Sequence, residues 1–224
     1  MDAKELLVSS QQMILTNLKL VLANGRFNYR TFGVDIEEYV CKELISIFTS
    51  GGFIHSVQNY HLAEDKNEFP DFTLLSVPPL AIEVKSGNHY RKSNGVWVGC
   101  KNSENDMGTL NVWQEKLSTF GGDNIYYVLI EYALSDNISD ILKVTAAPFY
   151  KFIGLNSDGL LKYREKDGNL RPKDFDQQSP IQTFHQFQSL FSETEIYRAK
   201  RIIKKHIQTI PDSERNSFLD SLKL

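Results

Sequence analysis

The segment from residue 69 to residue 85 limits most strongly how this chain can fold. The runs 69–75 and 80–85 both have the composition of β-strands, and Pro78 and Pro79 stand between them. Because consecutive prolines cannot donate hydrogen bonds to a strand ladder, they mark a turn rather than a continuous strand. The segment therefore predicts two short strands that pair as a hairpin.

Three charged side chains gather at one end of this expected hairpin. Side chains alternate between the faces of a strand, so Glu83 and Lys85 point to one face and Val84 to the other. Pairing across the turn brings Asp71 close to both charged residues. Carboxylates placed in this way bind Mg²⁺ through oxygen, and a nearby lysine can position or deprotonate an attacking water. The arrangement predicts phosphodiester hydrolysis; for Lys85, a plain salt bridge to Glu83 is the alternative.

These residues resemble the motif of the PD-(D/E)XK nucleases, the restriction-endonuclease-like superfamily. Pro70, Asp71, Glu83 and Lys85 match that motif residue by residue, and a helix-like segment precedes them. The flanking sequences Phe-Pro-Asp-Phe-Thr-Leu and Ile-Glu-Val-Lys-Ser-Gly look like those of orthodox type II restriction enzymes of the EcoRV-like group. The resemblance implies an α/β fold with a restriction-endonuclease-like core, in which helices flank a mixed β-sheet.

The resemblance also implies a set of site residues. Asp71, Glu83 and the backbone carbonyl of Val84 are the expected Mg²⁺ ligands, and Asp71, Glu83 and Lys85 the expected catalytic residues. In similar enzymes, a helix before the motif often carries an inward glutamate that joins the metal site, and Glu37 fits that pattern. The alternative for Glu37 is a helix-dipole role, because a glutamate early in a helix is favourable there.

Length and composition place the chain among globular proteins. Its 224 residues are 41% hydrophobic, which suits one domain with a substantial core. We expect N-terminal helices within 3–49, a catalytic core at about 53–153, and DNA-contacting loops with a C-terminal helix at about 156–224. Two cysteines suggest neither a disulfide framework nor a zinc site, and no apolar run reaches the length of a membrane span. We therefore expect a soluble, cytoplasmic protein.

Periodicity predicts the order of the remaining elements. Helices are expected at 3–23, at 35–49 with Asp35 as N-cap, at 110–120 and at 192–209. Strands are expected at 53–60, at 125–132, where an almost wholly apolar run indicates a buried central strand, and at 140–153, with an interruption at Pro148. Residues 86–109 are expected to form a polar loop, and residues 156–180 to be rich in loops.

Three polar segments, at 64–68, 102–109 and 163–175, are candidates for DNA contact. Asparagine can read adenine in the major groove, and cations can bind phosphates or guanine. Solvated loops are also rich in such residues, which is the alternative for each segment. The candidate residues are Lys66, Asn67, Asn102, Asn105, Thr109, Arg171 and Lys173. The basic helix around 198–206 indicates a solvated face, or a helix that contacts phosphate or supports a dimer.

Net charge and the lack of a nucleotide-binding loop narrow the class of nuclease. A net charge of −3 argues against a protein that coats DNA without specificity, and no Gly-rich phosphate loop indicates ATP use. The sequence predicts a Mg²⁺-dependent type II restriction endonuclease, part of a restriction–modification system, acting as a homodimer on a short palindromic site in double-stranded DNA. The alternatives are a DNA-repair or mobile-element endonuclease with the same core, or a catalytically inert DNA-binding module.

Overall fold

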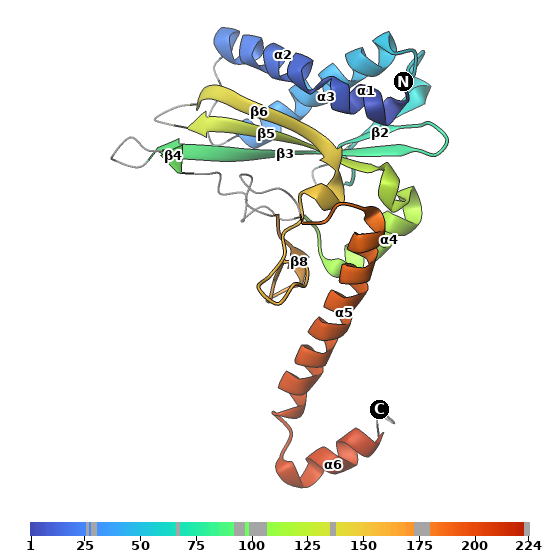
Figure 1. Cartoon of the computed structure of the whole chain (residues 1–224), viewed down its shortest axis with the longest axis vertical. Helices are drawn as coiled ribbons and strands as arrows, with labels where there is room; N and C mark the ends of the chain where they lie inside the picture. The colour runs from blue at the N-terminus through green and yellow to red at the C-terminus, as the bar shows by residue number, and fades with distance from the viewer. Residues whose placement is uncertain are drawn as a thin grey trace.

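A mixed β-sheet forms the centre of the protein, with helices on both of its faces in the computed structural model (Figure 1). The structure describes residues 1–25, 27, 31–65, 68–91, 97–98, 107–134, 138–172 and 180–221. The strands, in spatial order, are β1 (Tyr60–Leu62), β2 (Phe72–Leu74), β3 (Leu80–Arg91), β5 (Ile125–Leu134) and β6 (Ile138–Pro148), and β4 (Trp97–Val98) pairs with the far end of β3. The pairing of β3 with β5 is parallel and the other pairings are antiparallel.

Two sets of helices cover the two faces of the sheet. One face carries α1 (Ala3–Ser9), α2 (Gln11–Asn24) and α3 (Phe32–Ser50). The other carries α4 (Leu110–Phe120), the first half of α5 (Phe184–Ile207), and the small sheet of β7 (Tyr163–Arg164) and β8 (Asn169–Leu170). Short 3₁₀ turns lie at η1 (Val57–Asn59), η3 (Gly122–Asn124) and η4 (Phe149–Lys151). The central sheet and the elements packed on its two faces form the body of the protein. α5 continues beyond this body as a single helix and leads to α6 (Asp212–Ser221) (Figure 1).

The alternation of side chains along β3 divides the core in two. Ile82 and Val84 are fully buried against the cluster that contains α1, α2 and α3. Ala81 belongs to the opposite cluster, together with Tyr127 of β5 and Trp113 of α4. Because side chains of one strand alternate between faces, Glu83 and Lys85 share the face of Ala81. The two charged residues therefore point toward the side of α4 and α5.

The sequence-based hairpin is confirmed, as are two other elements. β2 and β3 pair antiparallel with Phe72 opposite Ile82, Thr73 opposite Ala81 and Leu74 opposite Leu80. The helix expected at 110–120 is α4, and the expected buried strand is β5, which extends to Leu134.

The N-terminal segment differs from expectation at three places. Residues 3–24 form two helices rather than one, bent by 51°; Ser10 lies between them, and its hydroxyl donates to the Leu6 carbonyl at 2.8 Å. Helix α3 begins before Asp35, so Asp35 lies in its first turn and is not the N-cap. Of the strand expected at 53–60, only Tyr60 lies in a strand, β1; Val57–Asn59 form the turn η1, and the Asn59 side chain accepts hydrogen bonds from the backbone of His55 and Ser56.

Three later elements also differ from expectation. β3 continues to residue 91 through the expected polar loop, because the parallel partner β5 extends its ladder. β6 ends at Pro148, where an interruption was expected, but η4 follows instead of a continuation of the strand to 153. α5 begins at residue 184 rather than 192, because Thr183 and Gln186 form a capping box and the first turns bury Phe187 and Phe191.

No single described helix is both long and apolar enough to cross a membrane, although the bent pair α1 and α2 passes that test together. In the fold, Leu7, Ile14 and Leu18 of this pair are completely buried in the core.

Gly122 allows the start of α5 to dock on η3, and we expect its replacement to destabilise the protein. A Cβ on Gly122 would lie 1.8 Å from the Phe184 ring, which packs against Phe149, Tyr150 and Phe187. Gly122→Ala should therefore cost about 1–3 kcal/mol of unfolding free energy, as overpacking usually does. Denaturant titration measures this cost. In a Phe184→Ala background the same change should cost much less, and an equal cost in both backgrounds would place the strain elsewhere.

Candidate active site

The predicted catalytic residues lie where two strands part. β2 pairs with β3 over Phe72–Leu74 only, whereas β3 continues alongside β5 as far as Tyr90. Asp71 directly precedes β2, and Glu83 and Lys85 follow on β3 just past the last paired residue, Ile82. The short β2 and the long β3 thus form a fork in which the three charged residues meet.

Direct contacts connect the residues of this fork. The Lys85 ammonium lies 2.5 Å from Glu83 Oε1. Asp71 Oδ2 accepts a hydrogen bond of 2.6 Å from the backbone N–H of Val84. The main chain of Val84 therefore contacts the site through its N–H.

Glu83 has an unsatisfied oxygen. The residue is 8% exposed, and its Oε2 is buried without a hydrogen-bond partner in the described part of the chain. A buried carboxylate oxygen without a donor is costly, and such an atom usually marks a place for a missing ligand or water. The donor set around it consists of hard oxygens, which suits Mg²⁺.

The carboxylates of the site oppose one another's ionisation. Burial, then repulsion from Glu83, raises the pKa of Asp71 to about 6, although Lys85 and the Val84 N–H act in the opposite direction. Burial and the charge of Asp71 raise the pKa of Glu37 to about 7. Burial lowers the pKa of Lys85, but the charges of Glu83, Asp71 and Glu37 outweigh it, so that this pKa is raised overall. Another positive charge would stabilise this group of carboxylates.

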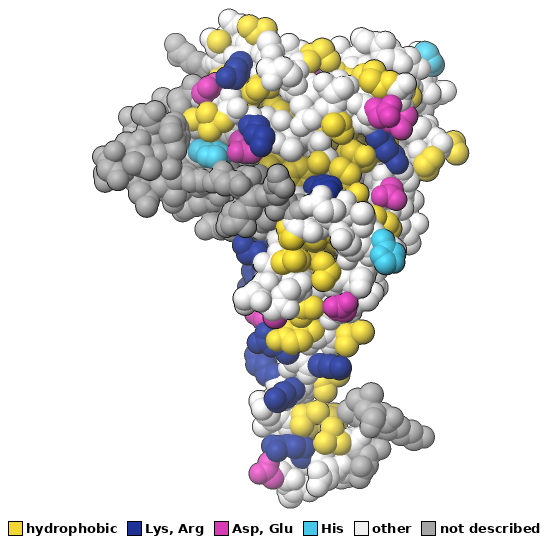
Figure 2. All heavy atoms as spheres, in the orientation of Figure 1, with side chains coloured by type: hydrophobic (Ala, Val, Ile, Leu, Met, Phe, Trp, Pro, Cys, Tyr) yellow, Lys and Arg dark blue, Asp and Glu magenta, His cyan; other side chains and the backbone are white. Residues whose placement is uncertain are grey.

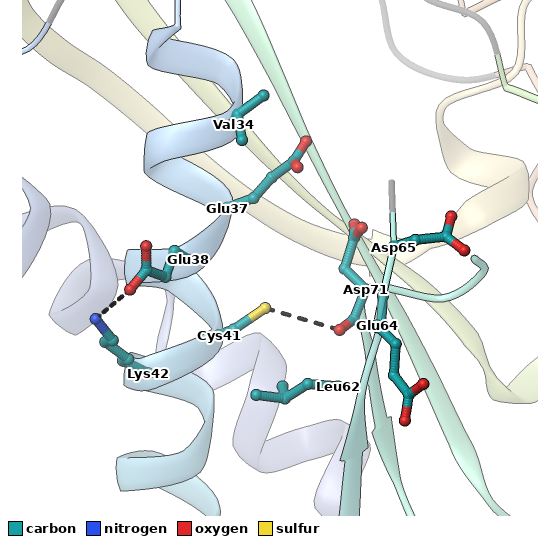
Figure 3. Close-up of a pocket in the computed structure, with 10 residues that line it drawn as sticks. Val34, Glu37, Glu38, Cys41, Lys42, Leu62, Glu64, Asp65 and Asp71 are labelled. Atoms are coloured by element: carbon teal, nitrogen blue, oxygen red, sulfur yellow. Dashed lines mark hydrogen bonds and ion pairs between the residues drawn. The ribbon is translucent and has the colours of Figure 1, made fainter. Parts of the chain in front are cut away.

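Glu37 joins the site from the helix layer. It lies on α3 and extends toward the strands, beside Asp71 (Figure 3). The two residues share a pocket of about 440 Å³ whose wall is rich in carboxylates. The lining residues are Val34, Glu37, Glu38, Cys41, Lys42, Leu62, Ala63, Glu64, Asp65 and Asp71. Among them Lys42 forms an ion pair of 2.5 Å with Glu38. In the described part of the chain, no three His, Cys, Asp or Glu side chains converge as a ready-made metal cluster.

Cys41 is buried beside the site and has a structural role. Its Sγ lies 3.9 Å from the carbonyl oxygen of Asp71. Burial, followed by the charges of Asp71 and Glu37, raises the pKa of the thiol to about 12. The thiol therefore stays protonated and is not a nucleophile.

Lys116 of α4 is a second cation near the carboxylates that sequence reasoning missed. It is 9% exposed, and its ammonium lies 3.4 Å from the ring centroid of Phe69 and 5.0 Å from that of Trp113. Burial lowers the pKa of Lys116 to about 8, although the charges of Glu83 and Asp71 raise it. The position of Lys116 in the sequence could have indicated its burial, because Lys116 follows Trp113 by three residues and so lies on the apolar face of the helix.

A buried contact between a histidine and a carboxylate lies farther along β3, on the same face of the sheet. His89 Nε2 is 2.8 Å from Glu131 Oε2, and both side chains are largely buried. Glu131 is paired in register with Gly87, so this contact continues the polar row that begins at Glu83 and Lys85.

The predicted DNA-contacting residues fall into two groups. Thr109 caps α4, accepting a hydrogen bond from the Val112 N–H at 3.4 Å, and the backbone of Arg171 bonds to Lys162 and Gly154. Both stand beside the core cluster of α4 and α5, on the face of Glu83 and Lys85. Lys66, Asn67, Asn102, Asn105 and Lys173 lie outside the described residues.

The fold is similar to that of a solved nuclease. The NlaIV restriction endonuclease superposes with a TM-score of 0.54 at 14% sequence identity, over 77% of this chain and 67% of that one. No protein-family model matches the sequence, and no curated protein matches it. The mixed sheet flanked by helices is thus a restriction-endonuclease-like fold, and the fold class expected from the sequence is confirmed.

Proposed function

We propose that this protein is a Mg²⁺-dependent endonuclease that acts on double-stranded DNA, in the manner of type II restriction enzymes. The observation that carries the proposal is the fork of Asp71, Glu83 and Lys85, with its unsatisfied buried carboxylate oxygen, in a restriction-endonuclease-like fold. We assign these three residues to the PD-(D/E)XK motif and group the site with the EcoRV-like enzymes.

Asp71, Glu83 and the Val84 carbonyl would hold the metal ion. Mg²⁺ keeps several of its waters, so one or two carboxylates suffice, and a ready-made three-residue cluster is not required. When bound, the ion supplies charge neutralisation at the phosphoryl group and an acidified water. The unpartnered Oε2 of Glu83 supports this assignment, because a cation there would satisfy it. Glu37 serves as a supporting carboxylate on the opposite wall of the pocket.

Lys85 acts as a hydrogen-bond donor in this scheme. Its ammonium is held by Glu83 at 2.5 Å, in the fork between β2 and β3. From there it orients the attacking water and donates to a phosphoryl oxygen, which lowers the energy of the developing negative charge. The ion pair with Glu83 thus positions Lys85 for catalysis, so the salt-bridge interpretation and the catalytic one describe the same contact.

We infer that the Lys116 ammonium is a second positive charge, after that of Lys85, that stabilises the DNA phosphate in the proposed reaction. Replacing it with Met keeps its stem against Phe69 and Trp113 but removes the ammonium. We expect Lys116→Met to reduce cleavage about 10- to 100-fold at saturating Mg²⁺, because one charge-stabilising donor is lost while the metal ligands stay. Single-turnover rates on a fixed DNA substrate measure this, with Lys19→Met on α2 as the matched control. A Lys116→Met protein that cleaves like the parent would make this lysine purely structural.

The proposed reaction implies a DNA partner and a homodimeric assembly. Each chain has one candidate site and would cut one strand, so double-strand cutting at a palindrome requires a two-fold homodimer. Thr109 and Arg171, with Lys66, Asn67, Asn102, Asn105 and Lys173, are the proposed DNA contacts. No nucleotide cofactor enters the proposed reaction. Sedimentation with and without DNA tests the dimer, and a strict monomer in both states would remove it.

Plasmid digestion separates the candidate functions. With Mg²⁺ and no ATP, a type II enzyme cuts plasmid DNA into discrete bands. Nicking or structure-dependent cutting would instead favour a DNA-repair or mobile-element endonuclease. A mobility shift without cutting would favour an inert DNA-binding module. Mapping the ends of discrete fragments would then give the recognition site and the stagger of the cut.

A further inference from the structure

The second half of α5 is an exposed arm. Thr194 is the last completely buried residue of the helix, and every residue from Ala199 to His206 is exposed. At 1.5 Å per residue, the stretch from Thr194 to Ile207 extends about 20 Å beyond the body. Figure 1 shows this part of α5 projecting from the side of the sheet opposite to α1, α2 and α3. Glu83 and Lys85 belong to the strand face on that same side, which they share with Ala81.

Charge is segregated around this arm. Placed at 100° per residue, its cations fall within one arc of about 160°. These cations are Arg198, Lys200, Arg201, Lys204 and Lys205. The opposite arc carries Ile196, Ile202 and Ile203, which are 55%, 40% and 42% exposed, together with Glu195 and His206. Figure 2 shows Lys and Arg side chains gathered along one side of the arm.

Most of these cations have no carboxylate partner among the described residues. Arg201 forms an ion pair with Glu165, and the Arg198 guanidinium packs on Gly168, where an added Cβ would lie 2.8 Å from it. Lys200, Lys204 and Lys205 are exposed and form no ion pair with the described residues. Like charges four residues apart destabilise an exposed helix by a few tenths of a kcal/mol, and Lys200 and Lys204 are such a pair. The chain has a net charge of −3 overall, so this basic arc is a local concentration and not a general property.

We propose that the basic arc of α5 is a second DNA-binding surface, which holds the phosphate backbone of the duplex outside the site of cutting. This proposal rests on the proposed function. A length of about 20 Å corresponds to about six base pairs, so the spacing of the cations suits a run of phosphates. A second copy of this chain would instead place cation against cation on this arc, which charge complementarity disfavours. The arm would therefore contribute affinity independent of sequence, while the fork and its loops act at the cut site.

A triple variant, Lys200→Gln, Lys204→Gln and Lys205→Gln, tests the arm. These lysines make no described contact with the body, so the fold should stay intact. We expect the slope of log affinity against log salt to flatten by about 2 to 3 units on a duplex of some 30 base pairs, because up to three phosphate contacts are lost. Binding is measured in Ca²⁺, and single-turnover cleavage at saturating DNA should keep the parent rate. The control is Lys4→Gln, Lys19→Gln and Lys143→Gln, which removes the same charge elsewhere.

The outcomes distinguish this proposal from the proposed function. If the parent cuts DNA but the triple variant and its control have equal salt slopes, the arm does not bind DNA and the nuclease assignment stands. If the variant loses DNA affinity while the parent never cuts DNA, the arm binds DNA and the nuclease assignment fails. A variant whose DNA affinity is unchanged but which no longer self-associates, or no longer binds anionic vesicles, would overturn the proposal in favour of a second copy or a membrane surface.

Discussion

A Lys85→Met protein is expected to lose Mg²⁺-dependent DNA cleavage by about 10³-fold or more, while it keeps its fold and its binding of DNA in Ca²⁺. In the proposed reaction the ammonium is the group that faces the phosphate, and Met retains most of the buried stem. Glu83 loses its ion-pair partner among the described residues in this variant, so some thermal stability should be lost in EDTA. Ca²⁺ should restore most of that loss, because a cation then lies beside Glu83 again.

Two comparisons make the Lys85 result interpretable. Lys19→Met on α2 removes an exposed lysine with one carboxylate partner, Asp140, and should cleave like the parent. Circular dichroism and melting show whether Lys85→Met is folded. Parent-like cleavage by a folded Lys85→Met protein would show that the Glu-Val-Lys strand is ordinary structure, and the nuclease assignment would then rest on coincidence.

An Asp71→Asn protein is expected to lose cleavage to a similar extent, yet to be more stable than the parent when metal is absent. Burial and the nearby Glu83 raise the pKa of Asp71 to about 6 from an ordinary value of 3.8. The folded state therefore binds a proton more tightly than the unfolded state, and ionising Asp71 reduces stability as pH rises from about 4 to about 6. Asparagine carries no charge, and its oxygen can still accept the hydrogen bond from Val84.

Melting in EDTA at pH 4 and at pH 8 measures this effect. The melting temperature of Asp71→Asn should exceed that of the parent by more at pH 8 than at pH 4, by about 2–4 °C for each kcal/mol of repulsion removed. Asp140→Asn, an exposed change on β6, is the matched control and should show no such difference. An advantage of Asp71→Asn that is the same at both pH values would show that its charge does not oppose folding.

The elements that could be predicted from sequence have strong local signals. The hairpin follows from its strand residues and Pro-Pro turn, α4 from its periodicity, and β5 from an unbroken apolar run. The motif alone placed Asp71, Glu83 and Lys85 together, and their contacts agree with that prediction. The early start of α5 was also readable, since Thr183 and Gln186 form a capping-box pattern that was overlooked.

The remaining features depend on contacts between distant parts of the chain. β3 reaches residue 91 through polar residues because β5, about forty positions later, supplies a parallel ladder. Lys116 is buried because Phe69 and Trp113 meet around it, and Phe69 lies in the hairpin segment. The break at Ser10 and the turn η1 arise where side chains compete for backbone hydrogen bonds, which propensity alone does not decide.

The two sides of the fork differ in how firmly they are held. Glu83 and Lys85 belong to a ladder that runs from Ala81 to Tyr90 at the middle of the sheet. Asp71, in contrast, directly precedes β2, a three-residue strand near the edge of the sheet. Local opening of a protein begins where few hydrogen bonds must break, so β1 and β2 can detach at a free-energy cost well below that of global unfolding. Such a fluctuation would remove Asp71 alone and disassemble the carboxylate pair in an otherwise native molecule. The lifetime of the assembled site is thus set by the three-residue strand β2, not by the stability of the whole protein.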